Sequence, residues 1–334
     1  NSSLLVASWS GPMAVPTLEA ELVVEMKAGL GEGSIWDSRS KKLLWLDIVG
    51  AKIFRFDPVS KSNEEFDLSS FSPFVSSVVP ISQDLDPHGD VVGVTLRDGF
   101  ATYNFRSRSL QRLGNDPGVQ EGERFNDGKV DPRGCYWAGT IARNSAGEIL
   151  AGASALYCRE ADGAVQVRKP KVSISNGIVW TKDSKVMYYI DTPSARVEAW
   201  DFDLSTGAIS NPRPAVSGFD FATTGFPDGC AIDTADRLWV ARFNGGCCGW
   251  YDPRSGELLA EVRVPAAAGK QVTSVAFGGE NLEDLYLTTA REGFDPAAAE
   301  RCPLAGSLFV VPKARLAEIG AVPGQPANQL KLAP

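Results

Sequence analysis

The chain has 334 residues, 43% of them hydrophobic and 22% charged, a composition that excludes a disordered protein and allows a buried core without disulfides. Its 33 basic and 41 acidic side chains give a net charge of −8, which argues against nucleic acid and anionic membrane surfaces as partners. No apolar run approaches the roughly 20 residues of a membrane-spanning helix. We therefore expect no nucleic-acid partner and no membrane partner.

The N-terminal stretch has neither the basic residue nor the long apolar core of a signal peptide, so we expect a cytoplasmic protein. Residues 1–13 are interpreted as an N-terminal extension or a non-native remnant, and residues 14–334 as one catalytic domain. Leu18–Met26 then alternates between apolar and polar residues, which is typical of a strand. We expect this segment to add an outer strand to the last unit of the fold.

From residue 31 onward a strand pattern repeats six times. Each period has a Gly-containing turn, a short apolar run, an Asp-centred turn and a second β-prone run, with further strand-like runs behind. The second runs begin near residues 44, 92, 136, 187, 238 and 285, about 44 to 51 residues apart. Three or four short strands per period of this length predict an all-β fold, a six-bladed β-propeller. One short helix is expected, near Pro296–Glu300.

Histidine and cysteine usage narrows the chemistry. The chain has one histidine, His88, in the turn-like string Asp86–Asp90, so multi-histidine zinc sites are excluded and a Ser-His-Asp triad would depend on this residue alone. Its six cysteines form no CxxC pair. We interpret them as small buried side chains in a reducing compartment, while the even number leaves a disulfide-bonded secreted protein open.

Four of the six repeats carry an oxygen-bearing side chain at the same place, directly before a glycine. These residues are Glu32, Asp127, Asn176 and Asp228, and the two weaker repeats have Ser or Thr there. In a propeller, equivalent positions of the innermost strands converge near the central axis, so these side chains would form a ring. Oxygen donors of this kind favour Ca²⁺, Mg²⁺ or Mn²⁺.

Each of these features also has a structural interpretation. Asn-Gly and Asp-Gly are common turn dipeptides, so any one of the four residues could serve only its turn. The recurring tryptophans are expected to pack between blades. Asp47, Asp191 and Asp233 lie at strand ends and are expected to cap turns. The metal ring is favoured because four donors share one phase of the repeat.

Several strings resemble one known family. They are Gly31-Glu32-Gly33 with Ile35-Trp36, Arg124-Phe125-Asn126-Asp127-Gly128-Lys129-Val130-Asp131, Ser175-Asn176-Gly177, Tyr189-Ile190-Asp191-Thr192 and Pro227-Asp228-Gly229. Over residues 28 to 290 the chain resembles the gluconolactonase, senescence-marker-protein and luciferin-regenerating-enzyme family, which includes regucalcin. The resemblance implies a six-bladed propeller that hydrolyses sugar-type lactones with one divalent cation.

The resemblance also implies roles for particular residues. It places Glu32, Asn176 and Asp228 as metal ligands, and Arg124 and Asn126 as substrate-binding residues. Asp127 could hold Arg124 or a water molecule, or belong only to its turn. The chain departs from the animal members after its Ala-Gly-Thr strand, where it has Arg143-Asn144 in place of an acidic residue that contacts the sugar. We expect Asn144 to bind substrate in its place, with Glu148 as the alternative.

The expected activity is hydrolysis of a lactone by metal-activated water, with Asp228 as the general base. Ca²⁺ is the expected cation, with Mg²⁺, Mn²⁺ or Zn²⁺ as alternatives. The partner is then a small-molecule lactone, and the protein a monomer or a weak homo-oligomer. Two other functions stay open: a metal-dependent esterase or phosphotriesterase on the same propeller, and a non-catalytic calcium-binding propeller.

Overall fold

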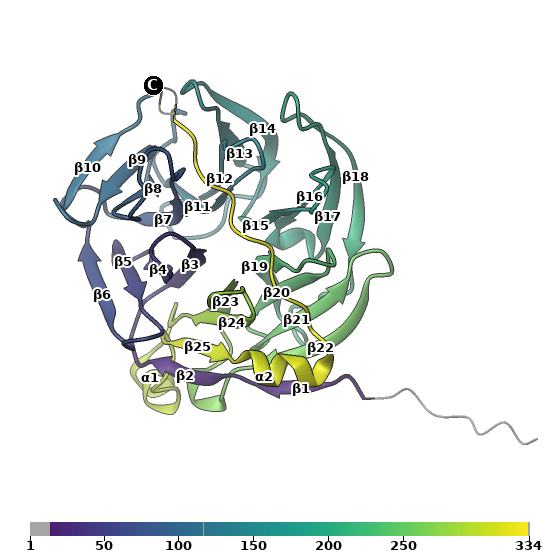
Figure 1. Cartoon of the computed structure of the whole chain (residues 1–334). Helices are drawn as coiled ribbons and strands as arrows, with labels where there is room; N and C mark the ends of the chain where they lie inside the picture. Colours follow the sequence, from purple (N-terminus) through teal and green to yellow (C-terminus); the bar gives the residue numbers. More distant parts are fainter. Residues whose placement is uncertain (1–13, 116, 333–334) are drawn as a thin grey trace, which may run out of the picture.

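The computed structural model describes residues 14–115 and 117–332. Its strands form six sheets, which Figure 1 shows arranged in a ring around a central axis. The sequence therefore predicted the all-β class and the six-bladed β-propeller correctly. Neighbouring innermost strands contact each other all the way round, from β3 through β7, β11, β15, β19 and β23 back to β3. The prediction for residues 1–13 lies outside the described residues.

The strands follow one another from the channel outward in each blade. The blades are, in order, β3 (Gly31–Asp37), β4 (Lys42–Asp47), β5 (Lys52–Phe56) and β6 (Asn63–Asp67); β7 (Val75–Pro80), β8 (Val91–Leu96), β9 (Phe100–Asn104) and β10 (Ser109–Arg112); β11 (Glu123–Val130), β12 (Tyr136–Ala142), β13 (Ser154–Arg159) and β14 (Val165–Val172); β15 (Ser175–Trp180), β16 (Val186–Asp191), β17 (Val197–Phe202) and β18 (Ile209–Val216); β19 (Phe226–Ile232), β20 (Leu238–Phe243), β21 (Cys247–Asp252) and β22 (Glu257–Arg263); and β23 (Val272–Gly278), β24 (Asp284–Thr289) and β25 (Leu308–Val311).

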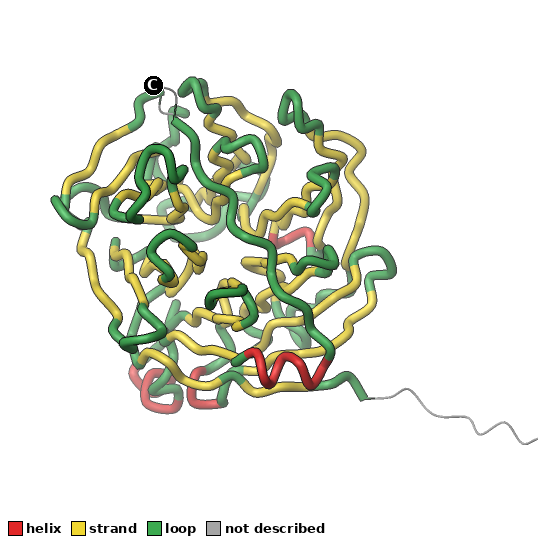
Figure 2. Tube along the Cα trace, in the orientation of Figure 1, coloured by secondary structure: helices red, strands yellow, loops and turns green. Residues whose placement is uncertain are grey.

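Helices are few and short, as Figure 2 shows. They are α1 (Pro296–Arg301), α2 (Lys313–Leu316), η1 (Thr192–Ser194), η2 (Ala266–Ala268) and η3 (Ala317–Ile319). The helix expected near Pro296–Glu300 is α1. It begins at the Asp295 cap, whose side chain accepts a hydrogen bond from the Ala298 amide at 2.6 Å, followed by a proline in the first turn.

The N-terminal segment closes the ring with two strands. β2 (Glu21–Val24) pairs antiparallel with β25 as the outer strand of the sixth blade, which confirms the prediction for this segment. β1 (Thr17–Glu19) adds a fifth strand to the fifth blade, parallel to β22. The sequence pattern did not separate the two strands. Together they join the first residues of the fold to its last two blades.

Aromatic rings fill the gaps between blades, as expected. Trp36 stacks on Tyr286 at 6.5 Å between the first and sixth blades. Trp137 and Trp180 meet edge to face at 5.9 Å between the third and fourth. Because each blade buries its faces only against its neighbours, these contacts hold the ring together.

One backbone irregularity recurs in every blade. The pairing of the innermost strand with the second strand shifts register near the start of β3, β7, β11, β15, β19 and β23. A bulge of this kind re-aims the side chains beside it. The glycine after each donor permits close packing there: a Cβ on Gly177 would lie 2.8 Å from the Asp228 carbonyl oxygen. The repeated dipeptide thus marks a bulge at the channel.

The three predicted caps are present, two of them at the end of the blades where the bulges lie and one at the opposite end. Asp47 accepts hydrogen bonds from the Gly29 and Leu30 amides at 3.0 Å, and Asp191 accepts one from the Ile174 amide at 3.0 Å. Asp233 caps a turn at the opposite end through the Ala235 amide at 2.9 Å. These carboxylates are bound to backbone and are not available to the channel.

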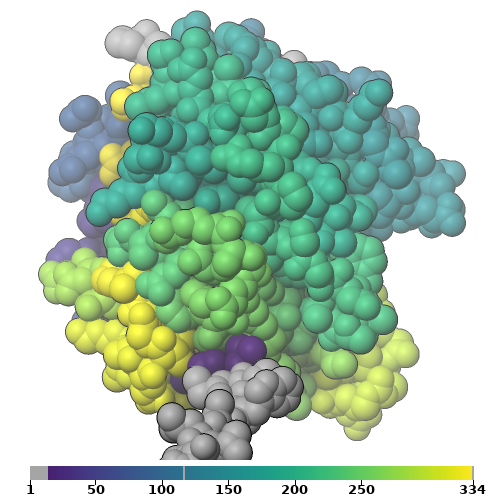
Figure 3. Space-filling model, turned by 90° about the vertical axis from the view of Figure 1, so that its right-hand side faces the viewer, coloured from purple at the N-terminus to yellow at the C-terminus, as the bar shows by residue number. Residues whose placement is uncertain are grey.

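The C-terminal residues 323–331 cross one mouth of the channel, as the yellow chain in Figure 1 shows. Backbone hydrogen bonds join them to four blades. In the fifth and sixth blades, Thr234 N binds Pro323 O at 2.9 Å and Gly324 N binds Leu282 O at 2.8 Å; in the second and third, Leu330 N binds Pro80 O at 2.8 Å and Lys331 N binds Gly134 O at 2.9 Å. Figure 3 shows the yellow C-terminal residues along the left side of the molecule. This closure was not predicted from the sequence.

Two further predictions can be compared with the described residues. His88 is exposed in the segment between β7 and β8, at the mouth that the C-terminal residues cross. All six cysteines lie in the described part of the chain without a disulfide; five are buried and Cys302 is half-buried. Within residues 14–115 and 117–332, no helix is long and apolar enough to cross a membrane.

Candidate active site

The four predicted oxygen donors lie near the starts of four innermost strands, at the mouth opposite the C-terminal segment. Glu32 is on β3, Asp127 on β11, Asn176 on β15 and Asp228 on β19. All four are buried, with 5 to 7% of each residue exposed. The bulges bring them to the channel from four different blades, as the repeat phase indicated.

Their carboxyl groups affect one another strongly. Burial, and then the charge of Asp127, raises the pKa of Glu32 to about 8, although the Gly33 amide and Arg124 act in the opposite direction. Burial, followed by the charges of Glu32 and Asp127, holds the pKa of Asp228 well above its ordinary value. Burial also raises the pKa of Asp127. Buried carboxylates without a counter-charge are costly, so this arrangement favours a bound cation.

Asp228 gives the most direct indication of that cation. Its Oδ1 is buried and has no hydrogen-bond partner within the described residues. By contrast, Glu32 Oε2 accepts the Gly33 amide at 2.9 Å, and Asp127 Oδ1 accepts the Gly128 amide at 2.7 Å. Buried polar atoms are normally paired, and an exception needs a physical reason. A dication held by Glu32, Asn176 and Asp228 would provide both the missing partner and the missing charge.

Asparagine side chains link the third and fourth blades beside these carboxylates. Asn126 Nδ2 donates to Asn176 Oδ1 and to the Ser175 carbonyl oxygen, both at 2.8 Å. Asn176 Nδ2 donates to Thr192 Oγ1 at 2.8 Å, and Thr192 donates in turn to the Pro227 carbonyl oxygen at 2.9 Å. This chain orients the Asn176 oxygen from both sides. Thr192 was part of a recognised motif, but no role was predicted for it.

Arg124 is the cation next to this network. Its Nη1 donates to Asn126 Oδ1 and to the Phe125 carbonyl oxygen at 2.8 Å, and its guanidinium lies 5.6 Å from the centre of the Phe74 ring. Burial lowers its pKa to about 10, so it stays charged at neutral pH. Asn126, rather than Asp127, therefore holds Arg124 in place.

Asn144 is not part of this network. Its Oδ1 accepts the Ala146 and Glu148 amides at 3.0 and 2.9 Å, and its Nδ2 donates to Glu148 Oε2 at 2.8 Å. Both polar atoms are thus bound within the loop between β12 and β13. The structure brings Arg124, Asn126, Asn176, Glu32 and Asp228 together, and leaves Asn144 in its loop. The substrate-binding role of Asn144 stays a prediction.

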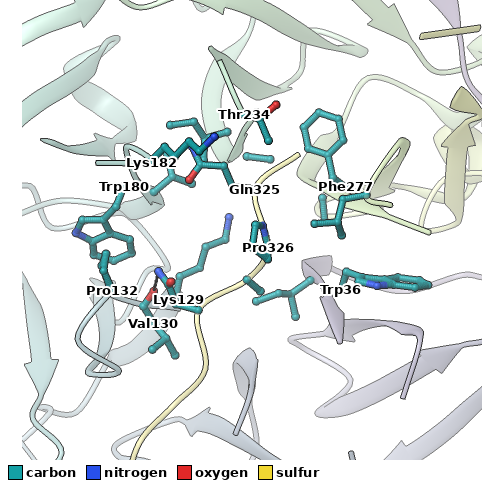
Figure 4. Close-up of a pocket in the computed structure, with 18 of the residues that line it drawn as sticks. Trp36, Lys129, Val130, Pro132, Trp180, Lys182, Thr234, Phe277, Gln325 and Pro326 are labelled. Carbon is teal, nitrogen blue, oxygen red and sulfur yellow. Dashed lines mark hydrogen bonds between the residues drawn. The ribbon is translucent and has the colours of Figure 1, made fainter. Parts of the chain in front are cut away.

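Two hollows lie along the channel; the larger is away from these carboxylates, and Asp127 lines the smaller. A cavity of about 350 Å³ lies beneath the C-terminal segment, and Figure 4 shows Trp36, Lys129, Trp180 and Phe277 around it with Pro326 crossing it. A second hollow of about 10 Å³ lies deeper, where Asp127 and Lys129 meet the fifth and sixth blades; it is just large enough for one water molecule. None of the predicted metal ligands lines the larger cavity.

A cysteine-containing cluster lies elsewhere. Among the described residues, the potential ligand atoms of Asp131, Cys135 and Cys158 lie within 4.8 Å of one another. Asp131 is already bound by Arg133 at 2.9 Å and by the Trp137 indole N–H at 2.9 Å. Burial raises the pKa of the Cys158 thiol, which disfavours the thiolate a metal needs. We therefore interpret this cluster as part of the packing of the third blade, with the Asp131 carboxylate already bound by Arg133 and Trp137.

The comparisons agree with this geometry. A sequence model described as "SMP-30/Gluconolactonase/LRE-like region" matches residues 30–291. The chain belongs to this family. It is 37% identical over 292 residues to YvrE of Bacillus subtilis (strain 168), which carries the name of a sugar lactone lactonase; the match covers 87% of this chain and 94% of YvrE.

Two other relatives cover almost the whole fold. The chain is 38% identical over 296 residues to regucalcin of Pongo abelii, with 88% of this chain and 94% of that protein covered. A solved structure of a luciferin-regenerating enzyme superposes with a TM-score of 0.80 at 30% identity, over 94% of this chain and 99% of that one. Membership of the family, expected from the motifs, is thereby confirmed.

Proposed function

We propose that the protein is a divalent-cation-dependent lactonase that hydrolyses sugar-type lactones. The observation that carries this proposal is the buried, unpartnered Asp228 Oδ1 beside Glu32, at the end of the channel where Arg124 is fixed. The name given to YvrE, which refers to sugar lactones, supports the substrate class. The reaction adds water across the ester C–O bond of the ring and releases a hydroxy acid.

Glu32, Asn176 and Asp228 are the residues that would hold the cation. Their donors are all oxygen atoms, which favours Ca²⁺, followed by Mg²⁺ or Mn²⁺, over Zn²⁺. When bound, such a cation polarises the lactone carbonyl and lowers the pKa of a water molecule. The hydrogen bonds from Asn126 and to Thr192 orient the Asn176 amide before the cation binds.

The remaining chemistry belongs to side chains of this chain. Asp228 Oδ1 accepts the proton of the attacking water, because no described residue donates to that atom. Arg124 binds the carbonyl or hydroxyl oxygens of the lactone through its guanidinium, whose position is set by Asn126 and Phe74. Because the single histidine is exposed at the other mouth, a Ser-His route has no base here.

The test is a pH-stat assay on glucono-δ-lactone and a five-membered sugar lactone after chelation. Ca²⁺, Mg²⁺, Mn²⁺ and Zn²⁺ are then added back singly. We expect chelation to abolish turnover and one metal, Ca²⁺ first, to restore it. Turnover that survives complete chelation would contradict the metal role.

The same assay separates the two other functions. No lactone turnover with any metal, but turnover of aryl esters or phosphotriesters, would assign another hydrolase activity to the site. No turnover of any of these compounds, together with a melting temperature that rises with Ca²⁺, would indicate a calcium-binding propeller without catalysis.

A further inference from the structure

An ion pair spans the mouth of the channel above the candidate active site. Arg143 Nη2 lies 3.3 Å from Glu292 Oε1, and the two residues are 149 positions apart. Arg143 follows β12 in the third blade, and Glu292 follows β24 in the sixth. Since the third and sixth blades are opposite each other in a ring of six, this contact can form only across the central axis.

Backbone pairing places both residues on the face of the carboxylates. Arg124 is paired with Ile141 at the end of β12, and the Arg143 amide donates to the Gly122 carbonyl oxygen at 2.8 Å. In the sixth blade, the start of β23 pairs with the end of β24. The yellow-green residues around α1, which follow Glu292 closely in the chain, lie at lower right in Figure 3, away from the C-terminal residues at left.

Glu292 is held rigidly although its side chain is 43% exposed. Gln271 Nε2 donates to the Glu292 carbonyl oxygen, and the Glu292 amide donates to Gln271 Oε1, both at 2.8 Å. Arg143 is also fixed, because its Nη1 donates to the Gly147 carbonyl oxygen at 2.9 Å. Neither backbone contact of Glu292 uses its carboxylate, so the carboxylate faces the entrance with the Arg143 guanidinium as its partner.

The pair is close enough to act on the residues below it. Burial lowers the pKa of Arg124 most; the charge of Glu292 opposes this lowering, and the charge of Arg143 adds to it. With a dication bound, the carboxylates of Glu32, Asp127, Asp228 and Glu292 balance the two guanidiniums and the cation. Glu292 thus cancels the positive charge that Arg143 would add to the entrance.

We propose that Arg143 and Glu292 form a charged roof that determines specificity, so that the site prefers uncharged polyhydroxylated lactones to lactones carrying a phosphate or a second acidic group. The guanidinium offers hydrogen-bond donors and the carboxylate offers acceptors, which suits exocyclic hydroxyl groups. An anionic substituent meets the Glu292 carboxylate at the same place. This inference rests on the proposed lactonase function and names the substrate subclass.

The decisive variants are Glu292→Gln and Arg143→Met. The experiment measures kcat/KM for glucono-δ-lactone and 6-phosphoglucono-δ-lactone with the restoring metal at one low ionic strength. We expect Glu292→Gln to raise the ratio of phosphorylated to neutral lactone about tenfold, and Arg143→Met to lower it. A merely structural pair would shift neither ratio. The gain in Glu292→Gln is expected to shrink at high salt.

Arg213 and Asp201 provide the matched control. Their exposed side chains form an ion pair of 2.7 Å between β17 and β18, away from the mouth. Arg213→Met and Asp201→Asn are expected to leave the ratio unchanged. If Glu292→Gln and Arg143→Met also leave it within twofold of the original protein, the proposed roof is wrong.

Binding of the product acids makes the test independent of turnover. Calorimetric Kd values for gluconate and 6-phosphogluconate are measured for the same variants, with the same expected changes of ratio. Lactone turnover with unchanged ratios overturns the roof but leaves the proposed function standing. Shifted binding ratios without lactone turnover support the roof as an anion-discriminating entrance and overturn the lactonase assignment.

Discussion

The two mouths of the channel differ in how their polar groups are satisfied. At the mouth crossed by residues 323–331, Gln325 and Asn328 donate to the Asp233 and Val130 carbonyl oxygens at 3.0 Å, and the cavity beneath is lined by aromatic and aliphatic side chains together with polar ones that include Lys129 and Lys182. At the other mouth, Glu32 and Asp228 are buried together and Asp228 Oδ1 has no described partner. The same repeat forms both mouths.

The covered mouth therefore contributes to the stability of the fold, whereas the other mouth keeps buried carboxyl groups close together. The covered mouth is closed by the C-terminal residues 323–331, which form backbone hydrogen bonds to four blades. At the acidic mouth, buried carboxyl groups raise one another's pKa, and the proposed cation would offset the cost of their charge. If this contrast is correct, changes at the acidic mouth alter activity, and changes at the covered mouth alter stability.

The largest expected effect is the loss of activity in Asp228→Asn. The substitution keeps the shape of the side chain but removes the proton acceptor and one ligand charge. We expect kcat/KM to fall by about 10²–10⁴-fold with the fold retained. The measurement is lactone turnover with saturating metal, alongside the circular-dichroism melting curve.

Asp47→Asn is the control for this prediction. Asp47 is a buried carboxylate at the same mouth, but it caps the Gly29 and Leu30 amides. We expect this variant to lose stability while keeping its kcat. An Asp228→Asn protein with full activity would remove Asp228 as the base.

Leu330→Ala should have the largest effect at the covered mouth. Leu330 is fully buried against the second blade, so its truncation is expected to cost about 2–5 kcal/mol in the free energy of unfolding. Chemical denaturation measures the loss, and kcat/KM is expected to stay unchanged. Leu204→Ala, at a side chain that is 50% exposed, should change stability by less than about 0.5 kcal/mol. Lost activity with unchanged stability would link the two mouths instead.

The smallest expected effect is a pH dependence of the metal-free protein. Glu32 has a pKa of about 8 in the folded chain against an ordinary value of 4.5, so between these values the folded state binds more protons than the unfolded state. The free energy of unfolding should therefore fall as the pH rises through this window. A saturating metal should remove this dependence, because it replaces the proton.

Melting temperatures of chelated and metal-loaded protein between pH 5 and pH 8 test this effect. Glu32→Gln is the control, because a neutral amide cannot titrate and the variant should show a smaller slope. Metal affinity should rise with pH over the same range, since the metal displaces a proton. If the chelated Glu32→Gln variant and the original protein show the same slope of stability against pH, the raised pKa of Glu32 is wrong.

Most of the fold could be predicted because its signals are local. The alternation of each strand, the turn dipeptides and the spacing of 44 to 51 residues all lie within single blades. The phase of Glu32, Asn176 and Asp228 predicted their convergence for the same reason. The C-terminal closure could not be predicted, because residues 323–331 carry no strand pattern and their partners lie in four different blades.

The site was predicted less completely than the fold. A sequence motif predicted Arg124 and Asn126. The role of Thr192 could not be predicted, because it depends on two hydrogen bonds to other segments: Thr192 accepts one from Asn176 and donates one to the Pro227 carbonyl oxygen. The sequence marked Arg143 only as a departure from the family pattern, and it gave no signal for Glu292. Their pairing depends on two loops from opposite sides of the ring.

The sequence by itself determined the repeat, the number of blades and the chemical nature of the donors, because these follow from side chains close together in the chain. Only the tertiary structure decided which donor keeps an unpaired atom, which asparagine holds Arg124 and which charges meet over the entrance. Burial and pairing depend on what packs against a group from other blades. That information lies in contacts between residues such as Arg143 and Glu292, far apart in sequence.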